Sequence, residues 1–137
     1  LHQKAGSKKV CELHGSTLRN FCTRCGKFYD ENFILESKNA PDTLPRCTDC
    51  GGLVKPDVVL YEEGLDDRIV EGAIQAIRQA DMLIIGGTSL VVYPAAGFIR
   101  SFTGKNLVMI NRTETSADSA ANLVLHQNLG TVFSHLH

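Results

Sequence analysis

The stretch that decides the fold is Asp81-Met82-Leu83-Ile84-Ile85-Gly86-Gly87-Thr88-Ser89. Residues 81–86 are almost wholly apolar, which is typical of a β-strand covered on both faces, as in a parallel sheet. The run then ends abruptly in glycines and hydroxyl side chains. In open parallel sheets ligands bind beyond the carboxyl ends of the strands, so residues 86–89 are a candidate ligand-binding turn.

Upstream of this run the pattern predicts a strand and then a helix. Residues 57–61 form a short β-branched and aromatic run, and Asp66 or Asp67 can cap the helix that follows. In that helix the apolar residues recur at helical spacing. They are Ile69, Val70, Ala73, Ile74 and Ile77.

Downstream, strand and helix continue to alternate. Pro94 is expected to start a helix that runs to Arg100, since proline is favoured at the first helical position. A strand at 107–110, a short apolar run at 123–125 and a closing helix from Leu129 follow. This spacing is that of parallel-sheet units, so the predicted fold class is α/β, part of a doubly wound, Rossmann-like sheet.

Four of the five cysteines form two Cys-x-x-Cys pairs, each followed by glycine. Each pair places two thiolates on one tight turn, and the glycine permits the positive φ that lets backbone N–H groups point at sulfur. The 21 residues between the pairs add little loop-closure entropy. Four protein ligands leave no position open for water, so the predicted zinc is structural. Its ligands would be Cys22, Cys25, Cys47 and Cys50.

A pair of disulfides is the alternative interpretation of these cysteines. No secretory feature indicates an oxidising compartment, so zinc is favoured. Cys11 stands alone in sequence, and we interpret it as a small core thiol.

The segment between the pairs reads as a loop-rich insert in which Pro41, Asp42 and Pro45 favour turns. Residues 19–54 are therefore predicted to form a small zinc-binding module. Residues 1–18 and 55–137 would form the partial Rossmann-like domain.

Charge and hydropathy exclude several classes of partner. The chain has 14 basic and 15 acidic residues, and the two kinds are interspersed. The sequence therefore predicts no cluster of basic residues that would bind nucleic acid. It has no apolar run near the roughly 18 residues of a membrane span and no signal-peptide pattern, so a cytoplasmic location is expected. The sequence opens at Leu1 in a loop-like segment, which predicts a fragment of a longer chain.

Three positions could carry chemistry, each with a structural alternative. The glycines of 86–89 let a ligand approach the backbone, and the hydroxyls of Thr88 and Ser89 can donate to phosphate or ribose, but a tight turn would use the same residues. Asn111 could bind a ribose or cap a turn. His14, followed by glycine, could exchange a proton near neutral pH or serve only the structure.

Taken together, these residues resemble the motifs of the sirtuins, in sirtuin order across nearly the whole chain. The matching segments are Leu1-His2-Gln3-Lys4-Ala5-Gly6, Glu12-Leu13-His14-Gly15, both cysteine pairs, Pro56-Asp57-Val58-Val59, Gly87-Thr88-Ser89-Leu90-Val91-Val92-Tyr93-Pro94-Ala95-Ala96 and Ile110-Asn111.

The resemblance implies the C-terminal, zinc-carrying part of a bacterial-type NAD-dependent protein-lysine deacylase. It makes His14 the general base, places Gly87, Thr88 and Ser89 against NAD, and places Asn111 on the adenosine ribose.

For the substrate, the resemblance implies an acyl-lysine protein or peptide. Val59 would lie in the strand that pairs with this peptide, and Val92 beside the acyl-lysine channel. The acyl oxygen would attack the ribose carbon that bears nicotinamide. His14 would then take a ribose hydroxyl proton, and the acyl group would end on ADP-ribose.

The sequence departs from the sirtuin pattern in two ways. Tyr61-Glu62-Glu63 stands where the family often has Phe-Gly-Glu, so peptide pairing there is expected to differ. The Gly-Ala-Gly half of the cofactor site is not in the sequence, so the chain alone is expected to be inactive, with the N-terminal half as its partner. A zinc-ribbon interaction module on an α/β platform and a mono-ADP-ribosyltransferase using the same NAD site remain the alternatives.

Overall fold

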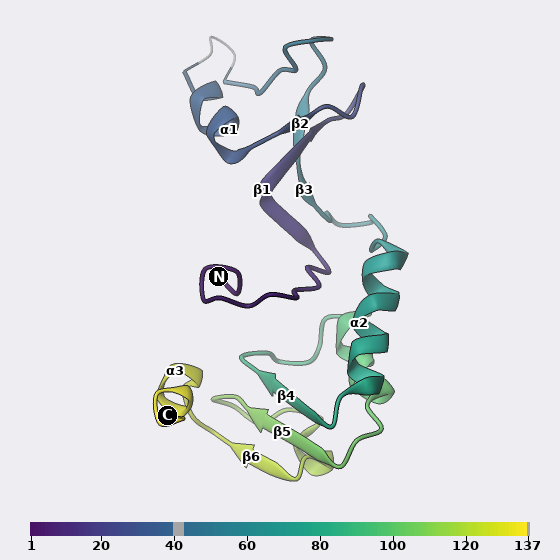
Figure 1. Ribbon diagram of the computed structural model, residues 1–137, viewed down its shortest axis with the longest axis vertical. Helices are drawn as coiled ribbons and strands as arrows, with labels where there is room; N and C mark the ends of the chain where they lie inside the picture. Colours follow the sequence, from purple (N-terminus) through teal and green to yellow (C-terminus); the bar gives the residue numbers. More distant parts are fainter. Residues whose placement is uncertain (40–42, 137) are drawn as a thin grey trace. The chain divides into compact units, whose positions relative to one another are not determined.

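The computed structural model describes residues 1–39 and 43–136. Contacts divide the chain into two compact units, Leu1–Asp66 and Asp67–His137, and each unit has its own three-stranded sheet (Figure 1). The assignment of residues 1–18 and 55–66 to the same domain as the second unit stays a prediction. None of the helices among the described residues combines the length and hydropathy needed to cross a bilayer.

The first unit is an antiparallel sheet with a short helix. Its strand order is β2-β1-β3, where β1 is Gly15–Cys22, β2 is Phe28–Tyr29 and β3 is Val54–Val58. Helix α1, Glu31–Ser37, begins after Asp30, whose side chain accepts a hydrogen bond from the Phe33 amide and so caps the helix.

The core of this unit is built around sulfur. Its buried members are Cys22, Tyr29, Cys47 and Val54, with Phe33, Ile34 and Cys50 packed against them. So few buried apolar residues give a small core, and small domains of this kind often add a structural metal or disulfides. We therefore expect the stability of this unit to depend on what its cysteines bind.

One expectation for this unit was wrong, and another missed an element. The strand expected at 57–61 lies at Val54–Val58 and pairs antiparallel with β1, so it is not the first strand of the parallel alternation. The insert expected to be loop-rich contains α1, because Asp30 caps it and the apolar residues Phe33 and Ile34 anchor it on the core. Residues 40–42, where turns were expected, lie outside the described residues.

The second unit is the predicted parallel sheet. Strand order is β4-β5-β6, both pairs are parallel, and Leu83 lies opposite Leu107 in the first of them. The α/β class is thereby confirmed. In chain order the elements are α2 (Asp67–Gln79), β4 (Met82–Gly86), η1 (Ala95–Ser101), β5 (Asn106–Ile110), η2 (Asp118–Ala120), β6 (Leu123–Leu125) and α3 (Leu129–Phe133).

Strand β5 carries the core of this unit, with Met109 and Ile110 almost completely buried. Strand β4 was expected to be covered on both faces, and that expectation was wrong for this chain. Met82 is 50% exposed and Ile84 is 45% exposed, and since alternate residues share one face of a strand, that face of β4 is not covered. Among the described residues β5 is the one neighbour of β4, so the other edge of β4 is unpaired. An unpaired apolar edge of this kind is a ready template for further strand pairing.

The segment after Pro94 is helical, as expected, but it is the 3₁₀ helix η1 and begins at Ala95. Pro94 itself takes the position before the first helical residue, without a side-chain cap. Short 3₁₀ segments are common connectors, and this one joins β4 to β5 and contacts α2.

Candidate functional site

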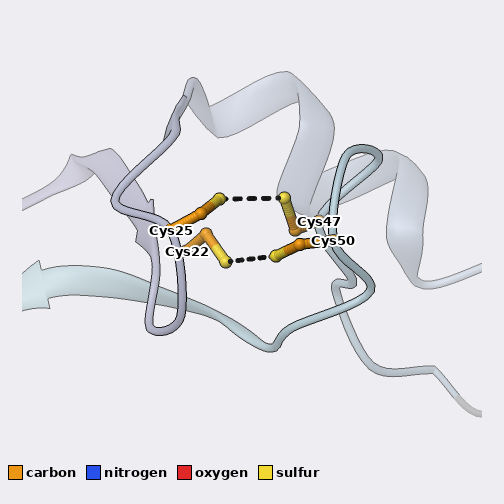
Figure 2. Close-up of side chains that lie close together, drawn as sticks. All are labelled: Cys22, Cys25, Cys47 and Cys50. Carbon is orange, nitrogen blue, oxygen red and sulfur yellow. Dashed lines mark hydrogen bonds between the residues drawn. The ribbon is translucent and has the colours of Figure 1, made fainter.

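Four cysteine side chains converge in the first unit (Figure 2). Cys22 ends β1 and Cys25 lies in the turn that follows, while Cys47 and Cys50 precede β3, so the sheet brings together residues far apart in sequence. The Sγ–Sγ distances are 3.4 Å between Cys22 and Cys50 and 3.5 Å between Cys25 and Cys47. All four sulfur atoms lie within 4.8 Å of one another.

The two turns have the same backbone design, as the glycine after each pair predicts. Gly26 has φ +73° and Gly51 has φ +70°, values that side chains larger than glycine rarely adopt. The Gly26 amide donates to the Cys22 carbonyl and the Gly51 amide to the Cys47 carbonyl, both at 2.9 Å. Each turn therefore holds its two thiols on one side of a tight loop.

The geometry fits a tetrahedral zinc ion. Zinc–sulfur bonds of about 2.3 Å imply sulfur–sulfur separations of about 3.8 Å, close to those found here. They are far from the roughly 2.05 Å of a disulfide, and all five cysteines are free. Although the Lys27 amide donates to Cys25 and favours its thiolate, the neighbouring sulfurs raise the pKa of Cys25 to about 12. A bound cation would offset this effect of the neighbouring sulfurs and favour the Cys25 thiolate, so the cluster suits a metal.

Tyr29 is a member of this site that the sequence interpretation missed. Its hydroxyl donates to Cys47 Sγ at 3.1 Å and accepts from the Thr48 amide at 2.8 Å. This donor lowers the pKa of Cys47 to about 6, because it stabilises the thiolate. The sequence offered one signal for this role, because Tyr29 closely follows a cysteine pair and a buried tyrosine usually finds a hydrogen-bond partner.

Tyr29→Phe is expected to weaken zinc binding by about 10- to 100-fold, the usual cost of losing a hydrogen bond to a metal ligand. Phenylalanine keeps the ring that packs on Phe33, whose centroid lies 4.1 Å away, so the fold should persist. Competition with a chromophoric chelator measures the affinity. An unchanged affinity would contradict a role for the hydroxyl at the metal.

A second candidate site lies at the carboxyl edge of the parallel sheet. All four residues predicted to face a cofactor line one cavity of about 380 Å³ in the second unit, together with Arg112 and Thr113. The four are Gly87, Thr88, Ser89 and Asn111. They meet because β4 and β5 are parallel neighbours, and the Gly87 amide donates to the Ile110 carbonyl at 3.1 Å.

Some of these residues also have the structural role in turns that was the alternative to ligand binding. Gly87 has φ +63°, and a Cβ there would lie 2.9 Å from Leu129 Cδ1, so glycine is needed for the turn itself. Asn111 Nδ2 donates to the Thr113 carbonyl at 3.0 Å. The Thr88 hydroxyl accepts from the Leu90 amide at 3.1 Å. These contacts fix the conformation of the residues that follow β4 and β5, and they leave a cavity beyond this edge of the sheet.

His126 supports this edge of the sheet. Its Nδ1 lies 3.3 Å from the Asn111 carbonyl, and its Nε2 lies 3.4 Å from a carboxylate oxygen of Asp118. The ring therefore links the end of β5 to the segment that carries η2. Nothing in its neighbouring sequence marks this role, because both partners are distant along the chain.

The remaining predicted residues are divided between the units. In the first unit, the His14 carbonyl accepts from the Val59 amide at 3.1 Å, so the candidate base adjoins the candidate substrate strand. The His14 side chain is exposed. Val92 lies in the second unit, 59% exposed, where its carbonyl accepts from Ala96 as η1 begins.

Comparison with known proteins points to one family. A model of the Sir2 family matches residues 1–94. The chain is 65% identical over 133 residues to an NAD-dependent protein deacetylase of Clostridium perfringens, and 56% identical over 132 residues to that of Clostridium acetobutylicum. In both cases the match covers 96% of this chain and 53% of the relative, so the chain spans about half the length of these relatives.

Solved structures agree over almost the entire chain. One described as "Sir2-p53 peptide-NAD+" has a TM-score of 0.90 and 36% identity, covering 99% of this chain and 57% of that one. Another, "Sir2 bound to acetylated peptide", has the same TM-score and identity and is covered to 58%.

Proposed function

The chain belongs to the Sir2 family, and from that premise we propose that it is the zinc-carrying part of an NAD-dependent protein-lysine deacylase. One observation carries the proposal. Gly87, Thr88, Ser89 and Asn111 come from separate segments, yet they line one cavity at the carboxyl edge of a parallel sheet. That edge is where doubly wound sheets bind nucleotides. The activity is proposed for the whole protein, of whose relatives this chain covers 53%.

In the proposed reaction NAD supplies an electrophilic ribose carbon with nicotinamide as its leaving group. Asn111 holds the adenosine ribose, and Gly87, Thr88 and Ser89 hold the neighbouring part of the dinucleotide. His14 takes the proton from the ribose hydroxyl, since a neutral imidazole nitrogen can accept a proton as a general base. Its exposed ring is free to meet a ligand.

The acyl-lysine substrate is proposed to bind beside Val59 as an added strand, with Val92 lining the acyl-lysine channel. The half-buried Val59 directly follows β3, and its neighbour Leu60 is 53% exposed, which leaves room for an added strand. The relatives described with acetylated or p53 peptides support a peptide substrate.

The four cysteines are proposed to hold one structural zinc ion that stabilises the first unit. We also propose a cytoplasmic location, and an N-terminal half that supplies the remaining wall of the cofactor site. The exposed apolar edge of β4 suits pairing with that half.

A nicotinamide-release assay on the whole protein tests the proposed function. Release should require NAD and an acetyl-lysine peptide, and the same peptide with unmodified lysine is the matched control. Release that needs no acyl group, with ADP-ribose found on a protein, would favour a mono-ADP-ribosyltransferase. Absence of release under all conditions would leave the chain an interaction module.

Asn111→Ala in the whole protein is expected to raise the dissociation constant of NAD about 3- to 10-fold, the value of one hydrogen bond to a ribose. Calorimetric titration with NAD measures it. Asn106→Ala is the control, since this asparagine begins β5, at the end opposite the cavity, where its Nδ2 donates to the Asp81 carbonyl at 3.2 Å. Equal affinity in Asn111→Ala and the parent protein would remove Asn111 from the ribose.

A further inference from the structure

Strand β1 contains a bulge that no sirtuin motif in the sequence explains. Ser16 pairs with Asp57 and Asn20 pairs with Pro56, so residues 17–19 have no partners on β3. Bulges re-aim side chains, and they are frequent beside active sites. Arg19 is the last of these three bulged residues.

Arg19 bridges the segment that precedes β1 and strand β3. Its Nη1 lies 2.7 Å from Glu12 Oε2, and its Nε lies 2.9 Å from Asp57 Oδ2. The second oxygen of Glu12 accepts from Gln3 Nε2 at 3.0 Å. The Arg19 hydrogen bond holds the pKa of Glu12 below its usual value, so the carboxylate is charged at neutral pH. Glu12, Arg19 and Asp57 together form a bracket of two ion pairs that share one guanidinium.

The two ends of this bracket flank the proposed catalytic junction. Glu12 stands two residues before His14, and Asp57 stands two residues before Val59. Between them the Val59 amide donates to the His14 carbonyl at 3.1 Å. Gly15 has φ +76°, and a Cβ there would lie 1.8 Å from the Asp57 carbonyl oxygen, so the two segments are in direct backbone contact.

We propose that Arg19 is a positioning residue that holds the His14 segment against the substrate strand through its two carboxylate partners. The inference rests on the proposed function of His14 and Val59. Arginine suits the role because its rigid fork presents Nε and Nη1 to two acceptors at once, whereas lysine offers a single point charge. Arg19 itself touches neither substrate nor cofactor in this role.

The test compares Arg19→Met and Arg19→Lys with the parent in the whole, zinc-loaded protein. The control is Lys27→Met, which breaks an ion pair of similar exposure, 2.6 Å from Asp49, away from His14. The first readout is hydrogen exchange of the Val59 amide. Arg19→Met should raise the exchange rate of the Val59 amide about tenfold, and Arg19→Lys should raise it less. Each partly exposed ion pair of Arg19 is weak, but both pairs hold the same contact between the His14 and Val59 segments. Lys27→Met should leave the exchange rate unchanged.

The second readout is kinetic. In Arg19→Met, kcat should fall and the KM for acyl peptide should rise, lowering kcat/KM by roughly tenfold, since small displacements of reacting groups carry large costs. The KM for NAD should not change, because the proposed NAD contacts lie in the other unit. A general loss of folding would instead change both the KM for NAD and the KM for acyl peptide, and it would lower the zinc content.

Val59 exchange within twofold of the parent in Arg19→Met would overturn the inference, as would a kinetic defect equal to that of Lys27→Met. A parent protein without deacylase activity would refute the proposed function instead. In that case the Val59 exchange result alone decides whether Arg19 holds the junction.

Discussion

Cys22→Ala is expected to abolish zinc binding and unfold the first unit. The buried core of that unit contains two of the four cysteines, so metal binding and folding are one event. Structural zinc sites of this kind contribute on the order of 10 kcal/mol or more of apparent binding free energy, far above the stability that so small a core supplies alone. Metal content should fall from one zinc ion per chain to background, and circular dichroism should lose the cooperative transition of this unit.

Cys11→Ala is the matched control for that substitution. Cys11 is exposed and lies outside the cysteine cluster, so its loss should leave both metal content and unfolding unchanged. The expectation of a core thiol was wrong, since its segment runs along the surface ahead of β1. Full zinc occupancy in Cys22→Ala, or reduced occupancy in Cys11→Ala, would contradict the assignment of ligands.

His14→Ala in the whole protein should lower the rate of deacylation by about 10² to 10⁴, the usual contribution of a general base. The fold should survive, because the His14 side chain is exposed and its contact with Val59 uses the backbone carbonyl. Single-turnover measurement of peptide deacylation isolates the chemical step from product release.

His135→Ala provides the comparison, since His135 is an exposed histidine whose Nδ1 contacts the carbonyl of Thr131 in the closing helix. Its activity should match that of the parent. A His14→Ala enzyme within twofold of the parent, with zinc content and unfolding unchanged, would remove His14 from the role of base.

Local sequence signals were enough to predict the second unit. The run at 81–86, the strand at 107–110 and the short strand at 123–125 all lie within a residue of the elements found. Each is an apolar run bounded by turn residues, so its structure is decided within a few positions. Gly87 and Asn111 come together because β4 and β5 are parallel neighbours, whereas a shared ligand for them was implied only by the sirtuin resemblance.

In the first unit, the sequence predicted only the cluster of metal-binding cysteines. The cysteine spacing predicted a cluster that the structure contains, whereas strand β1 was missed because a bulge at 17–19 interrupts its alternation. The partners of Arg19 are 7 and 38 residues away, and those of Tyr29 are 18 and 19 away. Contacts at such separations depend on the folded register, which composition and periodicity do not contain.

Glu62 shows a departure from the family that has a structural cost. Its φ is +70°, in the left-handed region that favours glycine, and it stands where sirtuins often have glycine. Glu63 next to it accepts from the Leu60 amide at 2.9 Å and from Lys55 at 3.1 Å, which holds the turn in place. The proposed substrate edge therefore keeps its turn while carrying an additional side chain.

The identity and amounts of the products test the central claim most directly. The whole protein is incubated with NAD and an acetyl-lysine peptide, and the mixture is analysed by mass spectrometry. The account predicts equal amounts of nicotinamide, deacetylated peptide and O-acetyl-ADP-ribose. Free acetate formed without nicotinamide, or nicotinamide released while the peptide keeps its acetyl group, would contradict it.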